Sequence, residues 1–355
     1  MDYRDCSVRG IKNAEFILRD IAQCREGEVV AIIIDDYVAA GGKLLALCAK
    51  KLGLRPFCVD LSMYGTMNFT EFDFRFIPQL KDALLASDVV ISGININILL
   101  NDPKLEDEMI AGARRFYRFY NLQSLNEVDY DYAGILADRK RTPLLRRIVE
   151  SASVMRITTE KGTDLTCDIG RKNLAAITEI LGLLPFFSEV ATVPNYGTVN
   201  GVVVADGAVQ KLRFNQFGKR EISGAPIRMT IEKSRLVDIA APAAQLARIR
   251  DFIDTPNPPA DKVDEVGLVT ATTPLNDYYQ WRIWGDGTHH SKSIHVALGN
   301  NYDNRSDLIH ASSHADFDVY NPKIEIDGTV VCRDGVFDDR VVEDLSVQIE
   351  RMARQ

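Results

Sequence analysis

The chain has 355 residues, of which 46% are hydrophobic and 26% are charged, a composition typical of a globular protein long enough for two domains. Its formal net charge of −8 argues against nucleic acid as the main partner, because a nucleic-acid groove needs a basic surface. The N-terminus lacks the apolar segment of a secretory signal, and no run of about 18 apolar residues is present. The six cysteines are scattered without a CxxC pair, which indicates free thiols in a reducing compartment. We therefore expect a cytoplasmic protein without a membrane span.

The first 150 residues alternate between predicted strands and predicted helices. The segment 28–35 (EVVAIIID) is a continuous apolar run rich in β-branched residues, as expected of a buried parallel strand. Further strands are predicted at 55–61, 88–96 and 116–122, and helices at 41–52, 79–86 and 104–114. This alternation predicts an α/β domain over residues 1–150, with an open parallel sheet and helices on both of its faces.

Two features of this region suggest binding but have plainer interpretations. The first turn, DDYVAAGGK, contains neither GxGxxG nor GxxxxGK[ST], so we interpret it as a structural turn rather than a nucleotide site. Five arginine and lysine residues cluster between positions 139 and 147. We interpret this stretch as the solvated face of a helix, and a local basic patch is the alternative.

After residue 150 the pattern changes to short strand-like runs separated by glycine and other turn residues. Strands are predicted at 154–159, 165–168, 201–205, 227–231 and 266–270, and a helix at 243–253, directly after Pro242. We predict an α+β metal-binding domain over residues 151–355, with a curved and mostly antiparallel sheet.

All five histidines fall within one short stretch of this second domain. They are His289, His290, His295, His310 and His314. Histidine is the commonest metal ligand and the usual acid–base group near neutral pH, so this clustering indicates a functional site rather than a coincidence.

The spacing of the neighbouring residues makes the hypothesis more specific. His314 and Asp316 form an HxD element, and on a strand both side chains would point to one face. His295 lies in a second strand-like run, SIHVALG, and the polar loop between the two runs contains Tyr302. That loop can fold back and bring the two strands together.

Two glutamates open β-like runs elsewhere in the domain. Glu189 begins EVATVP and Glu265 begins EVGLVT. A mixed set of histidines and carboxylates suits Zn²⁺, Mn²⁺, Co²⁺ or Fe²⁺, and does not suit a structural zinc site built from cysteines.

These residues lie in ordered blocks that resemble those of the thermophilic-aminopeptidase family of metallopeptidases, the aminopeptidase T and S type. The blocks are KGTDLTCDI (161–169), SEVATVPNYGTVNGVVVADG (188–207), SGAPIRMTIEKSRLVDI (223–239), DEVGLVT (264–270), SIHVALGNNY (293–302) and HADF (314–317). They resemble, among others, the family's GTDL, GEVFTAP, GEVAL, HLALG-x-x-Y and HLDF motifs. The resemblance covers the C-terminal half well, and the N-terminal domain only in general architecture.

The resemblance implies a ligand set and a reaction. The implied metal ligands are Glu189, Glu265, His295, Tyr302, His314 and Asp316. Such a set can hold one or two divalent ions, which would activate water to cleave an amide bond of a small peptide or other small amide. We also assign Glu265 an acid–base role. The family resemblance further implies a homodimer. It predicts no role for His289, His290, His310 or Asp318.

The alternative is an Fe²⁺-dependent ring-opening dioxygenase, because the same fold resembles 2,5-dihydroxypyridine 5,6-dioxygenase. The length of the chain favours this alternative. The ligands argue against it, since both glutamates are retained and residues 1–288 contain no histidine to assist the chemistry. We therefore prefer the hydrolase. A purely structural metal site is a third hypothesis, which an oxygen-rich set fits poorly.

Overall fold

The computed structural model describes the chain in segments. They are residues 6–36, 38–62, 78–93, 108, 112, 114–119, 122, 124–170, 174–175, 189–213, 216–217, 221–222, 226–254, 259–270, 292–299, 311 and 313–354. Contacts between Cα atoms divide the chain into two compact units, and the boundary falls after Ile135. None of the helices in the described segments is long and apolar enough to cross a membrane.

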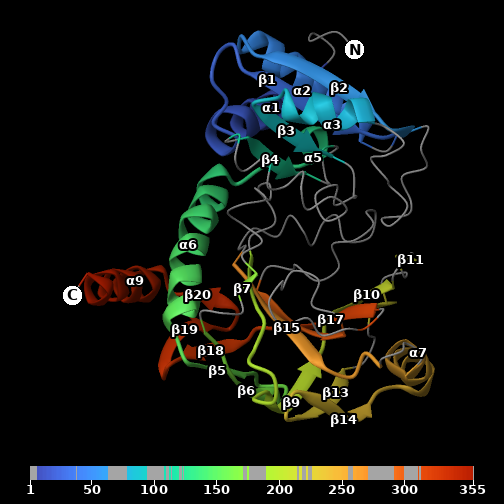
Figure 1. Ribbon diagram of the computed structural model, residues 1–355, viewed down its shortest axis with the longest axis vertical. Helices are drawn as coiled ribbons and strands as arrows, with labels where there is room; N and C mark the ends of the chain where they lie inside the picture. The colour runs from blue at the N-terminus through green and yellow to red at the C-terminus, as the bar shows by residue number, and fades with distance from the viewer. Residues whose placement is uncertain are drawn as a thin grey trace. The chain divides into compact units, whose positions relative to one another are not determined.

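The N-terminal unit contains a four-stranded sheet with the strand order β2-β1-β3-β4 (Figure 1). Its strands are β1 (Val29–Ile34), β2 (Arg55–Asp60), β3 (Val89–Ser92) and β4 (Arg115–Arg118). All three pairings are parallel, so the predicted open parallel sheet is confirmed. The β-branched run of β1 is buried between its two neighbours, as its continuous apolar pattern predicts.

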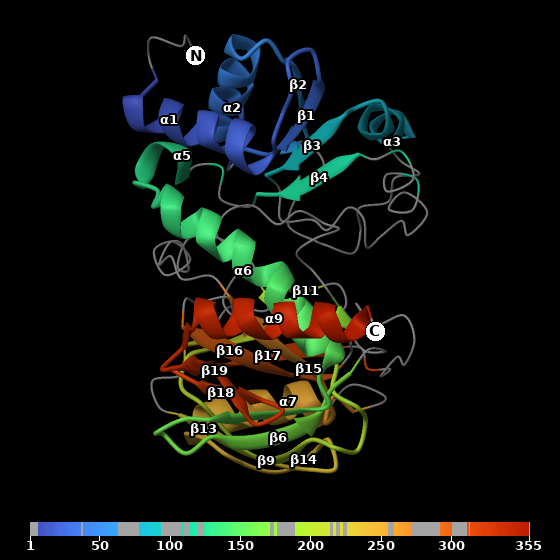
Figure 2. The ribbon, with the colours of Figure 1, turned by 90° about the vertical axis from the view of Figure 1, so that its left-hand side faces the viewer.

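Helices lie on both faces of this sheet (Figure 2). They are α1 (Val8–Phe16), the π-helical turn η2 (Ile17–Ile21), α2 (Ala39–Lys51), α3 (Pro78–Leu85) and α5 (Ser124–Glu127). Successive residues of a strand point to opposite faces. Accordingly, Ile34 of β1 packs against Gly42 of α2, whereas Ile33 packs in a cluster with Leu84 of α3.

The C-terminal unit contains two antiparallel sheets where the sequence predicts one. The first has the order β14-β13-β9-β6-β5-β18-β19-β20, and the second has the order β11-β10-β17-β16-β15-β8-β7, with β12 paired to β10. The strands are β5 (Val154–Thr158), β6 (Asp164–Asp168), β7 (Leu174–Ala175), β8 (Glu189–Thr192), β9 (Asn200–Ala205), β10 (Ala208–Arg213), β11 (Gln216–Phe217), β12 (Glu221–Ile222), β13 (Ile227–Glu232), β14 (Arg235–Ala240), β15 (Val263–Val269), β16 (Ser293–Gly299), β17 (Ser313–Tyr320), β18 (Lys323–Ile326), β19 (Thr329–Arg333) and β20 (Val336–Phe337). Helix α7 (Ala243–Asp254) begins directly after Pro242, as predicted.

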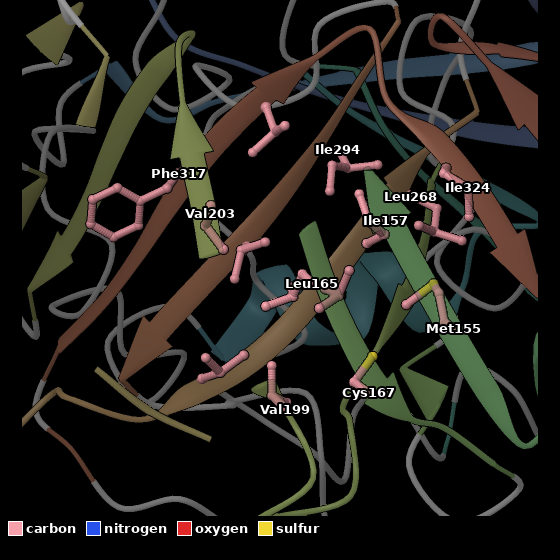
Figure 3. Packing of buried hydrophobic residues seen from close by; sticks show 14 of the residues in the cluster. Met155, Ile157, Leu165, Cys167, Val199, Val203, Leu268, Ile294, Phe317 and Ile324 are labelled. Atoms are coloured by element: carbon pink, nitrogen blue, oxygen red, sulfur yellow. The ribbon is translucent and has the colours of Figure 1, made fainter. Parts of the chain in front are cut away.

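One apolar cluster joins the two sheets (Figure 3). Met155 and Leu165 enter it from the first sheet, and Leu268, Ile294 and Phe317 enter it from the second. Each of these side chains is almost completely buried. One face of strands β15, β16 and β17 therefore packs in the core. Side chains on the opposite face can form a functional site.

The basic stretch predicted as a solvated face lies on helix α6 (Tyr132–Ser151). Most of its side chains pair with acidic residues, several of which lie on helix α9 (Asp339–Ala353). Lys140 lies 2.5 Å from Glu343 of α9. Arg141 is only 6% exposed, and it donates to Asp138 at 2.7 Å and to the carbonyl oxygen of Thr270 at 2.9 Å. The interpretation as a solvated face is therefore wrong for Arg141, because its charge is neutralised inside the protein.

Candidate metal centre

The five predicted site residues within the described segments lie on four adjacent strands of the second sheet. Glu189 is on β8, Glu265 on β15, His295 on β16, and both His314 and Asp316 are on β17. These strands are neighbours in the order β17-β16-β15-β8. All five side chains are buried. The antiparallel sheet thus brings together residues that are far apart in the sequence.

Strand register places these residues on one face, which we call the ligand face. Residues opposite each other in an antiparallel pair share a face, and the face alternates along each strand. His295 lies opposite Gly267 on one side and Asp318 on the other, while Glu189 lies opposite Val269. The ligand face consists of Glu189, Ala191, Glu265, Gly267, Val269, His295, Ala297, Gly299, His314, Asp316 and Asp318. The opposite face of the same strands supplies the apolar core.

Small residues separate the functional groups on the ligand face. Ala297 lies between Glu265 and Asp316 in the register. Gly267 lies directly beneath the side chains of Glu189 and His295. A Cβ at position 267 would be 2.0 Å from Glu189 Oε1 and 2.2 Å from His295 Nε2. Any side chain at 267 would fill the space in which these two groups meet.

Glu189, Glu265 and His295 form a compact cluster above Gly267. Nε2 of His295 lies 3.1 Å from Glu189 Oε1 and 3.2 Å from Glu265 Oε1. One ligand atom from each of the three residues lies within 4.8 Å of the others, close enough to share a metal ion. Three residues from three different strands therefore converge on one point.

His314 is held between two further carboxylates. Its Nε2 lies 2.8 Å from Asp316 Oδ1 on the same strand, and its Nδ1 lies 2.7 Å from Asp264 Oδ2 on β15. Asp264 is completely buried. Asp264 was not among the site residues predicted from the sequence, although it directly precedes Glu265 in the block DEVGLVT.

A β-bulge explains how two consecutive acidic residues reach the same face. The register between β15 and β16 shifts between Val263 and Glu265, so Asp264 is the extra residue of β15. A regular strand would direct Asp264 and Glu265 to opposite faces, whereas a bulge inserts one residue and changes the direction of its side chain. Asp264 thereby contacts His314 while Glu265 contacts His295.

The charges of this face are strongly coupled. Burial alone would lower the pKa of His295, but Glu189 and Asp316 outweigh that effect and raise it well above its usual value. The same balance, with Asp264 and Asp316 as the partners, raises the pKa of His314. Burial raises the pKa of Glu265 to about 7, against the opposing hydrogen bond to His295. The two clusters therefore share one electrostatic environment, since Asp316 acts on both histidines.

The donor set fits a divalent cation. Several carboxylates buried together are costly unless positive charge compensates them. Oδ1 of Asp264 is buried and has no hydrogen-bond partner among the described residues. Imidazole and carboxylate donors suit Zn²⁺, Mn²⁺, Co²⁺ or Fe²⁺, and His295, His314, Asp316, Glu189 and Glu265 are the residues that could hold one. Their role as ligands stays a prediction.

The remaining candidates from the sequence have different outcomes. Tyr302, His289, His290 and His310 lie outside the described residues. Asp318, for which the sequence predicted no role, is fully buried on the ligand face opposite His295. Its spacing from His314 and Asp316 follows the same alternation and could have identified it.

Comparison with known proteins identifies the family. A family model described as 2,5-dihydroxypyridine 5,6-dioxygenase matches residues 15–268, more than two thirds of the chain. The chain belongs to the 2,5-dihydroxypyridine 5,6-dioxygenase family. The matched range includes Glu189, Asp264 and Glu265 and ends before His295. No curated protein matches the sequence.

Two solved structures have a similar fold. The 2,5-dihydroxypyridine dioxygenase from Pseudomonas putida KT2440 is 15% identical with a TM-score of 0.67, and the match covers 95% of this chain and 98% of that chain. AmpT from Thermus thermophilus is 14% identical with a TM-score of 0.56, and the match covers 93% of this chain and 98% of that chain. Both relationships predicted from the sequence are confirmed, and the family match favours the dioxygenase over the preferred hydrolase.

Proposed function

We propose that the protein is an Fe²⁺-dependent enzyme that opens a dihydroxylated nitrogen-containing aromatic ring with dioxygen. The observation that carries the proposal is the placement of His295, His314 and Asp316 on neighbouring strands of one buried face. Two histidines and one carboxylate are the ligand set typical of non-haem iron oxygenases. Membership of the 2,5-dihydroxypyridine 5,6-dioxygenase family supports this choice of reaction and substrate class.

In this proposal the residues of the ligand face have separate tasks. His295, His314 and Asp316 would hold the metal ion. When bound, a ferrous ion supplies the redox chemistry that ring opening by dioxygen requires. Glu265 lies 3.2 Å from His295, and burial raises its pKa to about 7. A carboxylate with a pKa near the working pH is suited to accept a proton, and we assign Glu265 to accept the proton of a ring hydroxyl group.

A metal-dependent amide hydrolase of the aminopeptidase type is the second candidate, because the ligand face carries more carboxylates than a single iron site needs. Glu189, Glu265 and Asp318 lie on it in addition to Asp316, and the bulge turns Asp264 toward His314 on the same face. Together they provide enough negative charge for two divalent ions, which can position and activate water for amide hydrolysis. The fold shared with AmpT is compatible with this candidate.

One reconstitution experiment separates the two candidates. Metal-free protein is loaded separately with Fe²⁺, Mn²⁺ or Zn²⁺ and assayed with dihydroxypyridines, dipeptides and aminoacyl amides, in air and under argon. The proposal predicts ring opening only with Fe²⁺, and only in air, with stoichiometric consumption of dioxygen. Hydrolysis of an amide under argon with Zn²⁺ or Mn²⁺, without ring opening in air, would replace the proposal with the hydrolase.

A further inference from the structure

Asp264 contacts His314 in a way that neither the family resemblance nor the HxD element predicts. Its Oδ2 lies 2.7 Å from Nδ1 of His314, and Nε2 of the same ring lies 2.8 Å from Asp316 Oδ1. The two ring nitrogens therefore face different carboxylates, one on β15 and one on the histidine's own strand β17. This arrangement gives the two nitrogens different roles.

The bulge in β15 lies at Asp264, the residue that contacts His314. The register shift between Val263 and Glu265 adds one residue to the strand, and that residue is Asp264. Bulges next to active sites commonly redirect a side chain. Here the bulge turns a fully buried carboxylate toward His314, while Glu265 keeps its place beside His295.

His314 lies on β17, between strands β10 and β16 of the sheet. Its register partners are Leu212 on β10 and Gly299 on β16, and Gly299 has no side chain to pack against the imidazole. Asp264 reaches the ring from β15, two strands away in the sheet order, and accepts a hydrogen bond from Nδ1 when that nitrogen is protonated.

We propose that Asp264 is a positioning residue that keeps His314 protonated at Nδ1 and directs Nε2 to a divalent metal ion. The proposal rests on the proposed metal-dependent function, since it requires an ion on the ligand face. A carboxylate that binds one N–H of an imidazole fixes the ring orientation and the tautomer, and it makes the other nitrogen a better ligand. Asp264 contributes in this way without being counted among the ligands that the resemblance implies.

The first test measures metal affinity in the full-length, metal-free protein by competition for Zn²⁺ with a chromophoric chelator. Loss of a group that orients a metal-bound histidine typically weakens metal binding about 10–100-fold, and we expect this loss for Asp264→Ala. Asp264→Asn keeps an acceptor oxygen of the same shape and should lose clearly less. Asp206→Asn is the matched control, because Asp206 is a buried carboxylate of the same unit that pairs with Lys161 and accepts a hydrogen bond from the Tyr320 amide.

The second test reads the ring of His314 directly by ¹⁵N NMR of Zn²⁺-loaded protein with labelled histidine. The His314 signals are assigned by their loss in metal-free His314→Gln, and they are then followed while Zn²⁺ is added to the wild type. We expect Nδ1 to carry the proton in the wild type and in Asp264→Asn. A wild-type His314 protonated at Nε2, or a folded Asp264→Ala variant that binds Zn²⁺ within about twofold of the wild type, would overturn the proposal.

These outcomes are separate from the identity of the reaction. The protein could bind Zn²⁺ with the expected order of affinities, from the wild type through Asp264→Asn to Asp264→Ala, and yet open no ring under any condition. That result would refute the dioxygenase and support the role of Asp264. A wild type that binds no divalent ion overturns both proposals. If Asp264→Ala does not fold, Asp264→Asn and the NMR measurement still decide the role of Asp264.

Discussion

Substitution of Gly267 by alanine should disrupt the metal site through one added methyl group. The new Cβ would lie 2.0 Å from Glu189 Oε1 and 2.2 Å from His295 Nε2, whereas ordinary van der Waals contact begins near 3.4 Å. Both groups would have to move by more than an ångström, several times the tolerance of about 0.2 Å in metal–ligand distances. We expect Zn²⁺ affinity to fall at least about tenfold, and the stability of the metal-free protein to fall by about 1–3 kcal/mol.

The assay combines chelator competition for Zn²⁺ with urea unfolding of the metal-free protein. Gly170→Ala is the matched control, because the nearest atom to a Cβ at that position is 3.7 Å away and the φ angle is in the ordinary range. The control should bind Zn²⁺ with unchanged affinity. Wild-type affinity in Gly267→Ala would refute the assignment of Glu189 and His295 to one metal site, since both must move to admit the methyl group.

Three further predictions test other parts of the structure. His314→Ala should lose metal content and most activity while remaining folded, as measured by elemental analysis after dialysis and by far-UV circular dichroism. Because burial raises the pKa of Glu265 to about 7, its negative charge beside the metal-binding His295 is lost as the pH falls through that value. Zn²⁺ affinity should therefore fall as the pH is lowered from about 8 to about 6. The fall should be less steep in Glu265→Gln than in the wild type. Arg141→Met removes the cation that contacts the buried Asp138 at 2.7 Å and should destabilise the protein by about 3–5 kcal/mol in urea unfolding. Arg156→Met, at an exposed ion pair, should change the stability little.

Local patterns predicted much of the fold. The run VVAIII has no polar residue that could face water, so it could be identified as a central strand from its letters alone. The HxD spacing likewise determines that His314 and Asp316 share a face, whatever strand they pair with. These features could be predicted because they involve only neighbouring residues and the side-chain alternation that every extended strand shares.

Features that depend on strand pairing could not be predicted in the same way. The bulge at Asp264 is defined by the register of β15 against β16, and a single sequence does not reveal that register. The division of the C-terminal strands between two sheets depends on long-range pairings of the same kind. The charged face of helix α6 was interpreted as solvated, because the sequence does not show that Asp138 and Thr270 would surround Arg141.

The reaction depends on more than the ligand pattern. Glu189, Glu265, His295, His314 and Asp316 occur in the order expected of a thermophilic aminopeptidase, and that order favoured a hydrolase. The family match over residues 15–268 instead favours the dioxygenase. One fold can hold metal ions for either chemistry, so the site has to be tested by its metal and its substrate.

Iron binding at the ligand face can be tested directly by locating iron in crystals of the protein loaded with Fe²⁺ under argon, using anomalous scattering at the iron absorption edge. We expect an iron peak on the ligand face of strands β8, β15, β16 and β17, in contact with His295, His314 and Asp316. An iron-loaded crystal without a peak on this face, or with iron bound elsewhere in the chain, would contradict this expectation.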